Sequence, residues 1–375
     1  MRFLFFTPVV FLFYAGICFY IGARLFAFIR HFLPNVNAVA FWLPFGLLCC
    51  ALVFVNFLRH NLHFLRQAGS FWMAILLYML LLLVMFDFVK LLLFLFGKSF
   101  KNYRTYTVGA SLLLCALLIV FGVLHARSIK TVNYRLTLPG NGGGIRIVLV
   151  SDLHIGSSIG KPWIERVVDT INLEEPDIVC ISGDIFDGNL DIVRDLPGVI
   201  SQLGKIDAPL GVYASLGNHD VDRTRGSTER IEEILKAAGI LLLQDDVHTV
   251  RENLHIAGRR DARPIGMRAG RKSAEELCAG LSGTVIMLDH QPTQFTQIEQ
   301  AGAGLVLCGH THSGQIFPAN LATRIIFKKA GATHYGYWKG ETLQAVVTSG
   351  AGFWGPPLRI ATNSEVAVID VDFMP

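Results

Sequence analysis

The 375-residue chain is long enough for two or more domains, and its composition changes sharply along its length. The net charge of +4 and the lack of a Lys/Arg run interleaved with aromatic residues argue against a nucleic-acid partner. The seven cysteines show no disulfide-like spacing, which excludes a disulfide scaffold and favours a reducing compartment.

The first third of the chain contains four apolar stretches separated by short basic or aromatic loops. A membrane-spanning helix needs roughly 20 apolar residues, so three stretches are long enough and the last is near the lower limit. They are apolar on all faces, unlike helices that cover a soluble core. We therefore expect a four-helix transmembrane anchor over residues 1–127 of a multi-pass cell-membrane protein, with the lipid bilayer as a partner. The stretches are Phe3–Ile29, Val36–Leu58, Phe71–Phe96 and Val108–Leu124.

Charged residues inside and between these stretches leave two questions open. Asp87 and Lys90 lie three residues apart in the third stretch. They fit either a buried ion pair with a transport or signalling role, or a helix that overhangs the bilayer while Lys90 reaches the interface. With four spans, the N-terminus and the soluble part lie on the same side of the membrane. That side carries six basic residues, and the opposite side carries four. This difference favours a cytoplasmic soluble domain. The six are Arg2, Arg59, Arg66, Arg127, Lys130 and Arg135, and the four are Arg30, Lys98, Lys101 and Arg104.

Residues 128–375 have the composition of a globular domain. A Gly-rich segment, Gly140–Gly144, follows Tyr134–Leu138 and predicts a hairpin or loop. Short β-type runs then alternate with helical patterns such as Trp163–Asn172 and Ser227–Ala238. This alternation predicts an α/β domain in which two stacked β-sheets are flanked by helices. The runs are Ile145–Val150, Ile178–Ile181, Gly211–Leu216, Leu254–Ala257, Thr284–Leu288, Leu305–Leu307, Gln344–Val347 and Glu365–Val371.

Five of these predicted strands run directly into residues that can bind metal. Neighbouring strands place such residues along one edge of a sheet, and the glycines beside them allow tight turns and close backbone approach to a metal or phosphate. The five segments are Ser151-Asp152-Leu153-His154, Gly183-Asp184-Ile185-Phe186-Asp187, Gly217-Asn218-His219-Asp220, Asp289-His290-Gln291-Pro292 and Gly309-His310-Thr311-His312-Ser313-Gly314-Gln315.

The candidate ligands are carboxylates, imidazoles and an amide carbonyl, without thiolates. This set suits Mn²⁺, Fe or Zn²⁺ in mixed nitrogen and oxygen sites better than a structural zinc site. Seven ligands are too many for one ion. If one carboxylate bridges, they divide evenly between two ions roughly 3.5–4 Å apart, which is the arrangement for in-line displacement at phosphorus.

In this order, the five segments resemble the signature of the calcineurin-like metallophosphoesterase superfamily: Asp-x-His, Gly-Asp-x-x-Asp, Gly-Asn-His-Asp/Glu, a single His, and Gly-His-x-His. The match spans about residues 145–372. The extended last motif, together with Ser349–Gly352 and Pro356–Arg359, is similar to the membrane-anchored bacterial branch. In animals, the comparable architecture is that of the transmembrane protein with a metallophosphoesterase domain.

The resemblance implies two divalent metal ions, with Mn²⁺ expected and Fe or Zn²⁺ as alternatives. A hydroxide between the ions would be the nucleophile, His219 would protonate the leaving oxygen, and Asp220 would orient His219. The implied ligands are Asp152, His154, Asp184 and His312 for one ion, and Asp184, Asn218, His290 and His310 for the other, with Asp184 as the bridge.

Several nearby residues have two interpretations each. Asp187 fits a turn cap better than a metal ligand. Arg259 and Arg260 fit a grip on a substrate phosphate or a solvated turn equally well. Three aromatic residues near the end of the chain, Trp338, Phe353 and Trp354, fit either an apolar mouth that faces lipid or core packing, and we favour core packing. The paired lysines Lys328 and Lys329 are expected to be exposed surface charges.

The leading functional hypothesis is a hydrolase of a phosphomonoester, phosphodiester or pyrophosphate in a lipid or lipid precursor, because the anchor confines the site near headgroups. Related hydrolases that split UDP-2,3-diacylglucosamine have Arg at the position of His219 and His-Gly-Asp at that of His290-Gln291-Pro292, which puts that substrate in doubt. One alternative is a non-catalytic membrane receptor or scaffold, which would be expected to have lost a ligand. Another is a transporter with an accessory hydrolase domain, which only Asp87 and Lys90 would support.

Overall fold

The computed structural model describes residues 2–54, 63–140, 143–220, 227–262 and 270–374. Its internal contacts divide the chain into two compact units, Met1–Gly122 and Val123–Pro375. The division falls a few residues before the domain boundary predicted after residue 127. Leu58, Arg59, Asn141 and Gly142, which entered the predictions, lie outside the described residues.

The N-terminal unit contains the four predicted helices, α1 (Arg2–Phe32), α2 (Ala38–Phe54), α3 (His63–Leu95) and α4 (Tyr103–Ala126). Within the described residues, α1, α3 and α4 are long and apolar enough to cross a membrane. The last predicted helix, α4, has 24 residues and so is not near the lower limit as predicted, whereas α2 has 17 residues up to Phe54, where the described stretch ends. The Asn37 side chain accepts the N–H of Val39 at 2.7 Å and starts α2 two residues later than predicted.

Asp87 of α3 has its partners on a different helix from the one expected. Its carboxylate accepts hydrogen bonds from the Tyr20 hydroxyl at 2.6 Å and from the Arg24 guanidinium, and both donors belong to α1. Lys90 is exposed instead. Asp87, which is partly buried, therefore ties α1 to α3 within the apolar unit, since a carboxylate among apolar helices is stabilised by a paired cation.

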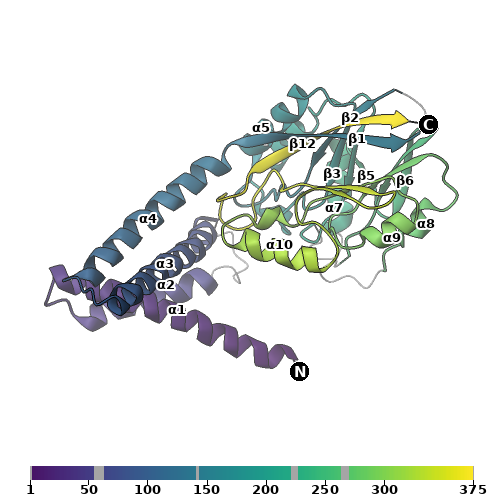
Figure 1. The fold of residues 1–375 in the computed structure, drawn as a ribbon. Coiled ribbons are helices and arrows are strands. Elements are labelled where there is room, and N and C mark those ends of the chain that lie inside the picture. Colours follow the sequence, from purple (N-terminus) through teal and green to yellow (C-terminus); the bar gives the residue numbers. More distant parts are fainter. Residues whose placement is uncertain (1, 55–62, 141–142, 221–226, 263–269, 375) are drawn as a thin grey trace. The chain divides into compact units, whose positions relative to one another are not determined.

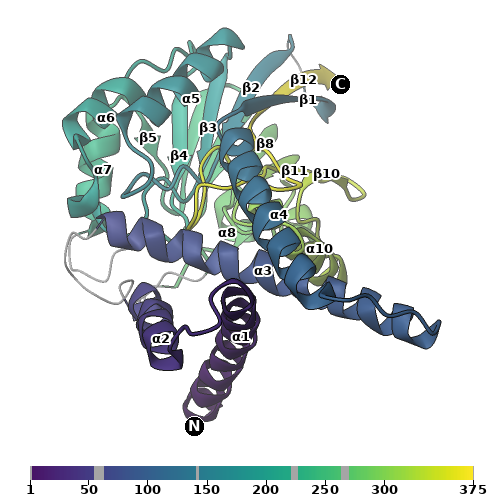
Figure 2. The ribbon, with the colours of Figure 1, turned by 90° about the vertical axis from the view of Figure 1, so that its left-hand side faces the viewer.

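The second unit is built on two six-stranded mixed sheets (Figures 1 and 2), which confirms the predicted fold class. In spatial order, the first sheet contains β1 (Ile129–Pro139), β12 (Ser364–Met374), β2 (Ile145–Val150), β3 (Ile178–Ser182), β4 (Val212–Ser215) and β5 (Leu241–Leu242). The second contains β10 (Gly336–Lys339), β11 (Gln344–Val347), β9 (Leu305–Cys308), β8 (Thr284–Leu288), β7 (Leu254–Gly258) and β6 (Asp246–Arg251).

Helices cover the outer face of each sheet, so the domain has four layers. Helices α5 (Lys161–Leu173), α6 (Leu196–Leu203) and α7 (Ser227–Ala237) share a buried cluster with the first sheet, and Figure 2 shows them together beside β2–β5. Helices α8 (Ala274–Cys278) and α9 (Phe295–Gln300) pack in the same way on the second sheet.

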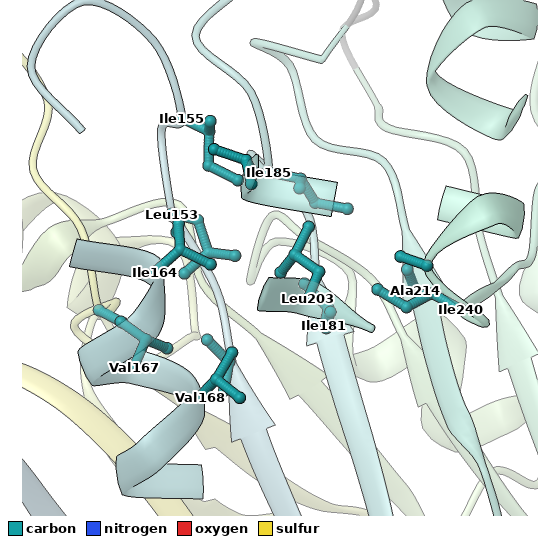
Figure 3. Close-up of a cluster of buried hydrophobic side chains, with 14 of the residues drawn as sticks. Leu153, Ile155, Ile164, Val167, Val168, Ile181, Ile185, Leu203, Ala214 and Ile240 are labelled. Atoms are coloured by element: carbon teal, nitrogen blue, oxygen red, sulfur yellow. The ribbon is translucent and has the colours of Figure 1, made fainter. Parts of the chain in front are cut away.

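The central strands are apolar on both faces because both faces are buried. In β2, Ile147 and Leu149 pack against the second sheet, whereas Val148 and Val150 join the cluster under the helices. Figure 3 shows that cluster, with Val167 and Val168 of α5 directed towards the strands. This burial explains why the strands read as unbroken apolar runs in the sequence.

The Gly-rich segment does not close a hairpin. β12 lies between β1 and β2, pairing parallel with β1 and antiparallel with β2. β1 and β2 therefore lie on opposite sides of β12, and β1 is held in the sheet by β12 alone among the described strands.

Candidate metal centre

The predicted ligands stand directly after strands whose carboxyl ends meet. In the first sheet β2, β3 and β4 are parallel neighbours, and in the second β8 and β9 are parallel neighbours. The loops after them carry all seven predicted ligands: Asp152 and His154, Asp184, Asn218, His290, and His310 and His312. Parallel strands place these loops at one edge, as in other α/β sheets whose sites lie at the carboxyl ends of strands.

Hydrogen bonds join the two sheets at this edge. The Ser182 hydroxyl at the end of β3 donates to the carbonyl of Leu307 in β9 at 2.7 Å. The imidazole Nδ1 of His290 lies 2.8 Å from the carbonyl of Ser182, and the backbone N–H of His310 donates to the Asp152 carboxylate at 3.0 Å. The positions of ligands from one sheet are therefore fixed by groups from the other.

Five of the seven ligands have left-handed backbone conformations. Their φ angles are 54° for Asp152, 46° for His154, 51° for Asp184, 72° for His310 and 48° for His312. Such angles are uncommon for residues other than glycine, and they persist where the surrounding structure imposes them. Their concentration here marks a strained edge that holds side chains in a set geometry.

Three groups of side chains could each hold a metal ion, and the third shares His154 with the first: Asp152, His154 and His312; Asp184, His290 and His310; and His154, Asp187 and His219. In the first, the Nε2 atoms of His154 and His312 are 3.1 Å apart, and Asp152 Oδ1 is 3.4 Å from His312 Nε2. Asp184 joins the groups because its Oδ2 lies 3.1 Å from His290 Nε2 and 3.8 Å from His154 Nε2.

Burial and local charge favour protonation states that suit metal binding. Burial lowers the pKa of His310 to about 4, with a further contribution from His290, and burial beside His154 places the pKa of His312 well below its usual value. Burial acts to raise the pKa of Asp184, but His290 and His154 outweigh it and lower this pKa. Neutral imidazoles and an ionised carboxylate are the forms that bind a cation.

Unpaired polar atoms provide a test of whether a cation fits. Among the described residues, the buried Oδ1 of Asn218 has no hydrogen-bond partner, and the buried Nε2 of His290 has none apart from its 3.1 Å approach to Asp184 Oδ2. Burial lowers the pKa of His290, but Asp184 outweighs this and raises it, so a positive charge is favoured at this nitrogen. Buried polar atoms without partners are rare in folded proteins, and here they converge on carboxylates. The residues fit divalent cations.

A cavity of about 450 Å³ opens beside these groups. Asp184, Asn218 and His310 line it together with Thr323 and Trp354. A volume of this size is that of a small-molecule site, and one wall carries the candidate metal ligands.

His219 lies at this cavity, and its neighbours differ from the expected ones. Its Nδ1 is 3.4 Å from the Asp187 carboxylate, and Asp187 is also 3.7 Å from His154 Nδ1. Asp220, which was expected to orient His219, instead accepts the backbone N–H groups of Phe186 and Gly217 at 2.7 and 2.8 Å. Asp187 thus has the contacts that the prediction gave to Asp220, because the Asp220 side chain turns into the protein and braces the loops.

The arginines that follow β7 do not reach the cavity. Arg259 is 3% exposed and pairs with the Asp289 carboxylate at 2.8 Å, and Arg260 lies 3.8 Å from Asp245. A grip on a substrate phosphate is therefore not supported. Asp289, beside the ligand His290, is occupied by Arg259 and by Arg271 at 2.9 Å.

The aromatic residues near the end of the chain divide between core and mouth. Trp338 packs on Phe295, and the buried Phe353 packs on Trp163, as core packing predicts. Trp354 is 59% exposed and its ring lies 6.1 Å from that of His219. One of the three residues thus forms part of the mouth.

Arg359 is a supporting residue that motif reasoning missed. It is fully buried, and its guanidinium donates to the backbone carbonyls of His312, Ser349, Gly350 and Gly352 at 2.7–3.1 Å. It holds the loop after β9 to the loop after β11. The only signal in the sequence was its place in the segment Pro356–Arg359, and that segment was recognised as a resemblance alone.

The fold and the site define a metal-dependent phosphoesterase. A family model described as calcineurin-like phosphoesterase matches residues 145–314. An uncharacterized metallophosphoesterase of Campylobacter jejuni is 30% identical over 299 residues, which cover 76% of each chain. The chain belongs to the calcineurin-like metallophosphoesterase family.

Other similar proteins include one that is named as a transmembrane protein and solved structures with lower sequence identity. The transmembrane protein with metallophosphoesterase domain of Danio rerio is 31% identical over 276 residues, which cover 69% of this chain and 61% of that relative. Among solved structures, a dimetal phosphatase from Danio rerio superimposes with a TM-score of 0.34 at 13% identity, covering 58% of this chain and 90% of that chain.

Proposed function

We propose that the chain is a membrane-anchored phosphoesterase with two divalent cations, Mn²⁺ in preference to Fe or Zn²⁺. The observation that carries this proposal is the gathering of the predicted ligands from two sheets: six of the seven belong to groups that could hold a metal ion, and four of the seven, Asp184, Asn218, His310 and His312, line one cavity. The proposed ligands of the first ion are Asp152, His154, Asp184 and His312, and those of the second are Asp184, Asn218, His290 and His310. The position of Asp184 between the two groups supports its role as the bridge.

The cations would activate a water molecule for attack on phosphorus and neutralise the phosphoryl oxygens. The protein's own contribution to bond cleavage would come from His219. Its side chain is 26% exposed, whereas those of His154 and His290 are nearly inaccessible, so it can reach a substrate in the cavity. We assign it the transfer of a proton to the leaving oxygen, with Asp187 holding its Nδ1.

The proposed substrate is a phosphoester or pyrophosphate of a lipid or lipid precursor. The three membrane-length helices support this assignment, because they keep the site within reach of headgroups. UDP-2,3-diacylglucosamine is one candidate, weakened by His219 and by Gln291-Pro292 where the related hydrolases differ. If all four helices cross the bilayer, the basic residues favour a cytoplasmic catalytic domain.

The test uses the full chain, purified in detergent, stripped of metal and reloaded separately with Mn²⁺, Fe²⁺ or Zn²⁺. Elemental analysis should give two ions per chain. Mn²⁺-loaded protein should then hydrolyse members of a panel of p-nitrophenyl phosphate mono- and diesters, phospholipids and nucleotide-diphospho-lipids. One ion per chain would overturn the dinuclear centre, and two ions without hydrolysis would favour the scaffold.

A matched pair of variants checks the bridge. Asp184→Asn should weaken both sites and lower turnover by several orders of magnitude, because Asp184 alone is proposed to contact both ions. Asp169→Asn removes a carboxylate from the exposed side of α5 and should change neither property. Near-normal turnover in Asp184→Asn combined with loss in His312→Ala would move the bridge elsewhere.

A further inference from the structure

Helix α10 (Ala319–Lys329) presents its apolar side chains to solvent. Leu321 is 47% exposed, Ile325 55% and Ile326 63%, and the helix has no buried residue. The residues on its opposite face, which are the partly buried ones, are Asn320, Thr323 and Phe327. The exposure of these residues shows that the helix turns two polar residues towards the domain and its aliphatic residues outwards. Figure 1 shows α10 at the surface of the domain.

This orientation is the reverse of that of the other surface helices. α5 buries Ile164, Val167, Val168 and Ile171 against the first sheet, as an amphipathic helix normally does. An exposed aliphatic face on a folded domain indicates a surface that binds a membrane or another protein.

The apolar surface continues to the mouth of the metal cavity. Ala319 and Thr323 of α10 line that cavity together with Ile316. On either side of them, Phe317 is 44% and Trp354 59% exposed. A layer that covered α10 would therefore lie beside the opening through which substrate enters.

The charges around α10 have one sign. The segment 316–332 contains Arg324, Lys328 and Lys329 and no acidic residue. All three are exposed, and none forms an ion pair with a carboxylate within the described part of the chain. Aliphatic residues flanked by lysine and arginine are typical of helices that lie in the interface of an anionic membrane.

We propose that α10, together with Phe317 and Trp354, is a docking surface for an anionic bilayer leaflet, so that the metal cavity opens among lipid headgroups. The bilayer is always near, because α4 ends at Ala126 and β1 begins at Ile129, which tethers the domain to a membrane-length helix. Docking itself is independent of the metals. The consequence, that a membrane-resident phosphoester is the substrate, rests on the proposed function.

Photo-crosslinking of the full chain in liposomes tests the docking surface. The photoreactive residue p-benzoylphenylalanine is placed at Ile326, or at Leu173 of α5 as the control, because Leu173 is an equally apolar residue that is 81% exposed. The vesicles contain phosphatidylcholine with or without phosphatidylglycerol. Position 326 should give roughly tenfold more lipid adducts than position 173, and more with phosphatidylglycerol present.

Three outcomes would overturn the docking surface. Equal lipid adducts at the two positions would leave α10 without a lipid contact. Adducts of position 326 with a second copy of the chain would make the surface a protein interface. An adduct yield unchanged by Lys328→Gln with Lys329→Gln would remove the role of charge.

Kinetics separate this surface from the proposed function. Ile325→Glu with Ile326→Glu should lower hydrolysis of a vesicle-borne phospholipid roughly tenfold while hydrolysis of a soluble p-nitrophenyl ester stays unchanged, and Leu173→Glu should affect neither. If the parent protein hydrolyses the soluble ester but no lipid, the lipid substrate fails while the crosslinking result stands. Equal losses on both substrates would show that the variant damages the site and would contradict a docking role.

Discussion

Gly183→Ala should disturb the metal centre by displacing one imidazole. Gly183 follows β3 with a φ of +79°, and a Cβ at this position would lie 2.5 Å from Nδ1 and 2.8 Å from Cβ of His290. The ring has little room to move, because His290 is fully buried and its Nδ1 contacts the carbonyl of Ser182 at 2.8 Å. The methyl group therefore forces either the ring or the β3 loop to shift.

The size of each effect can be worked out from these distances. Left-handed backbone destabilises alanine by about 1–2 kcal/mol, and overpacking adds about 1–3 kcal/mol, so the free energy of unfolding should fall by about 2–5 kcal/mol. Ordinary van der Waals contact begins at 3.4 Å. His290 must then retreat by about 1 Å, a displacement that can lower turnover about 100-fold.

Gly280→Ala provides the control for backbone strain. Gly280 has a φ of +76°, and nothing lies within 4 Å of the added methyl group. Thermal unfolding, metal content and p-nitrophenyl ester hydrolysis are measured on both full-length variants. Both should lose stability, but only Gly183→Ala should lose bound metal and turnover. If Gly183→Ala keeps two ions and near-normal turnover, His290 does not hold an ion at this place.

Three further predictions concern residues that hold or use the site and the anchor. Arg359→Met removes the donor to four buried carbonyls, so the free energy of unfolding should fall by at least about 3 kcal/mol, and the melting temperature by about 6 °C or more in differential scanning fluorimetry; a shift within about 2 °C would show that these bonds are replaceable. His219→Ala should retain both ions yet slow alkyl phosphate hydrolysis roughly 10²–10⁴-fold, with a smaller loss on p-nitrophenyl esters. Asp187→Asn should give the same pattern with weaker losses. Equal losses on both ester classes with one ion missing would make His219 a ligand. Arg24→Leu leaves the Asp87 carboxylate, which is 37% exposed, without its cation, so it should destabilise the detergent-solubilised chain by about 1–3 kcal/mol. Arg24→Leu with Asp87→Leu should recover most of this loss in thermal melts.

Most central strands of the catalytic domain could be predicted from the sequence, because strands that are buried on both faces form continuous apolar runs. The runs Ile145–Val150, Thr284–Leu288 and Gln344–Val347 coincide with β2, β8 and β11 as predicted. Each of the five motifs begins where such a run ends, so the polar residues that come after each apolar run are those that gather at the sheet edge. Strand ends and side-chain chemistry are local properties, and local properties survive in a single sequence.

Features that depend on the three-dimensional path of the chain were not accessible in the same way. β1 pairs with β12, more than 200 residues away, and no local signal marks that pairing. Asp87 meets Arg24 of another helix, although Lys90 is nearer in sequence. Asp220 adjoins His219 in the sequence whereas Asp187 belongs to an earlier motif, yet in the folded chain it is Asp187 that faces the His219 ring.

The position of β12 makes completion of the first sheet depend on a strand that is synthesised more than 200 residues after β1. β12 is the only described strand that links β1, and through it α4, to the remainder of the first sheet. A chain that stops before Ser364 would lack this strand, and β1 and β2 would each expose an unpaired edge on the side that β12 occupies.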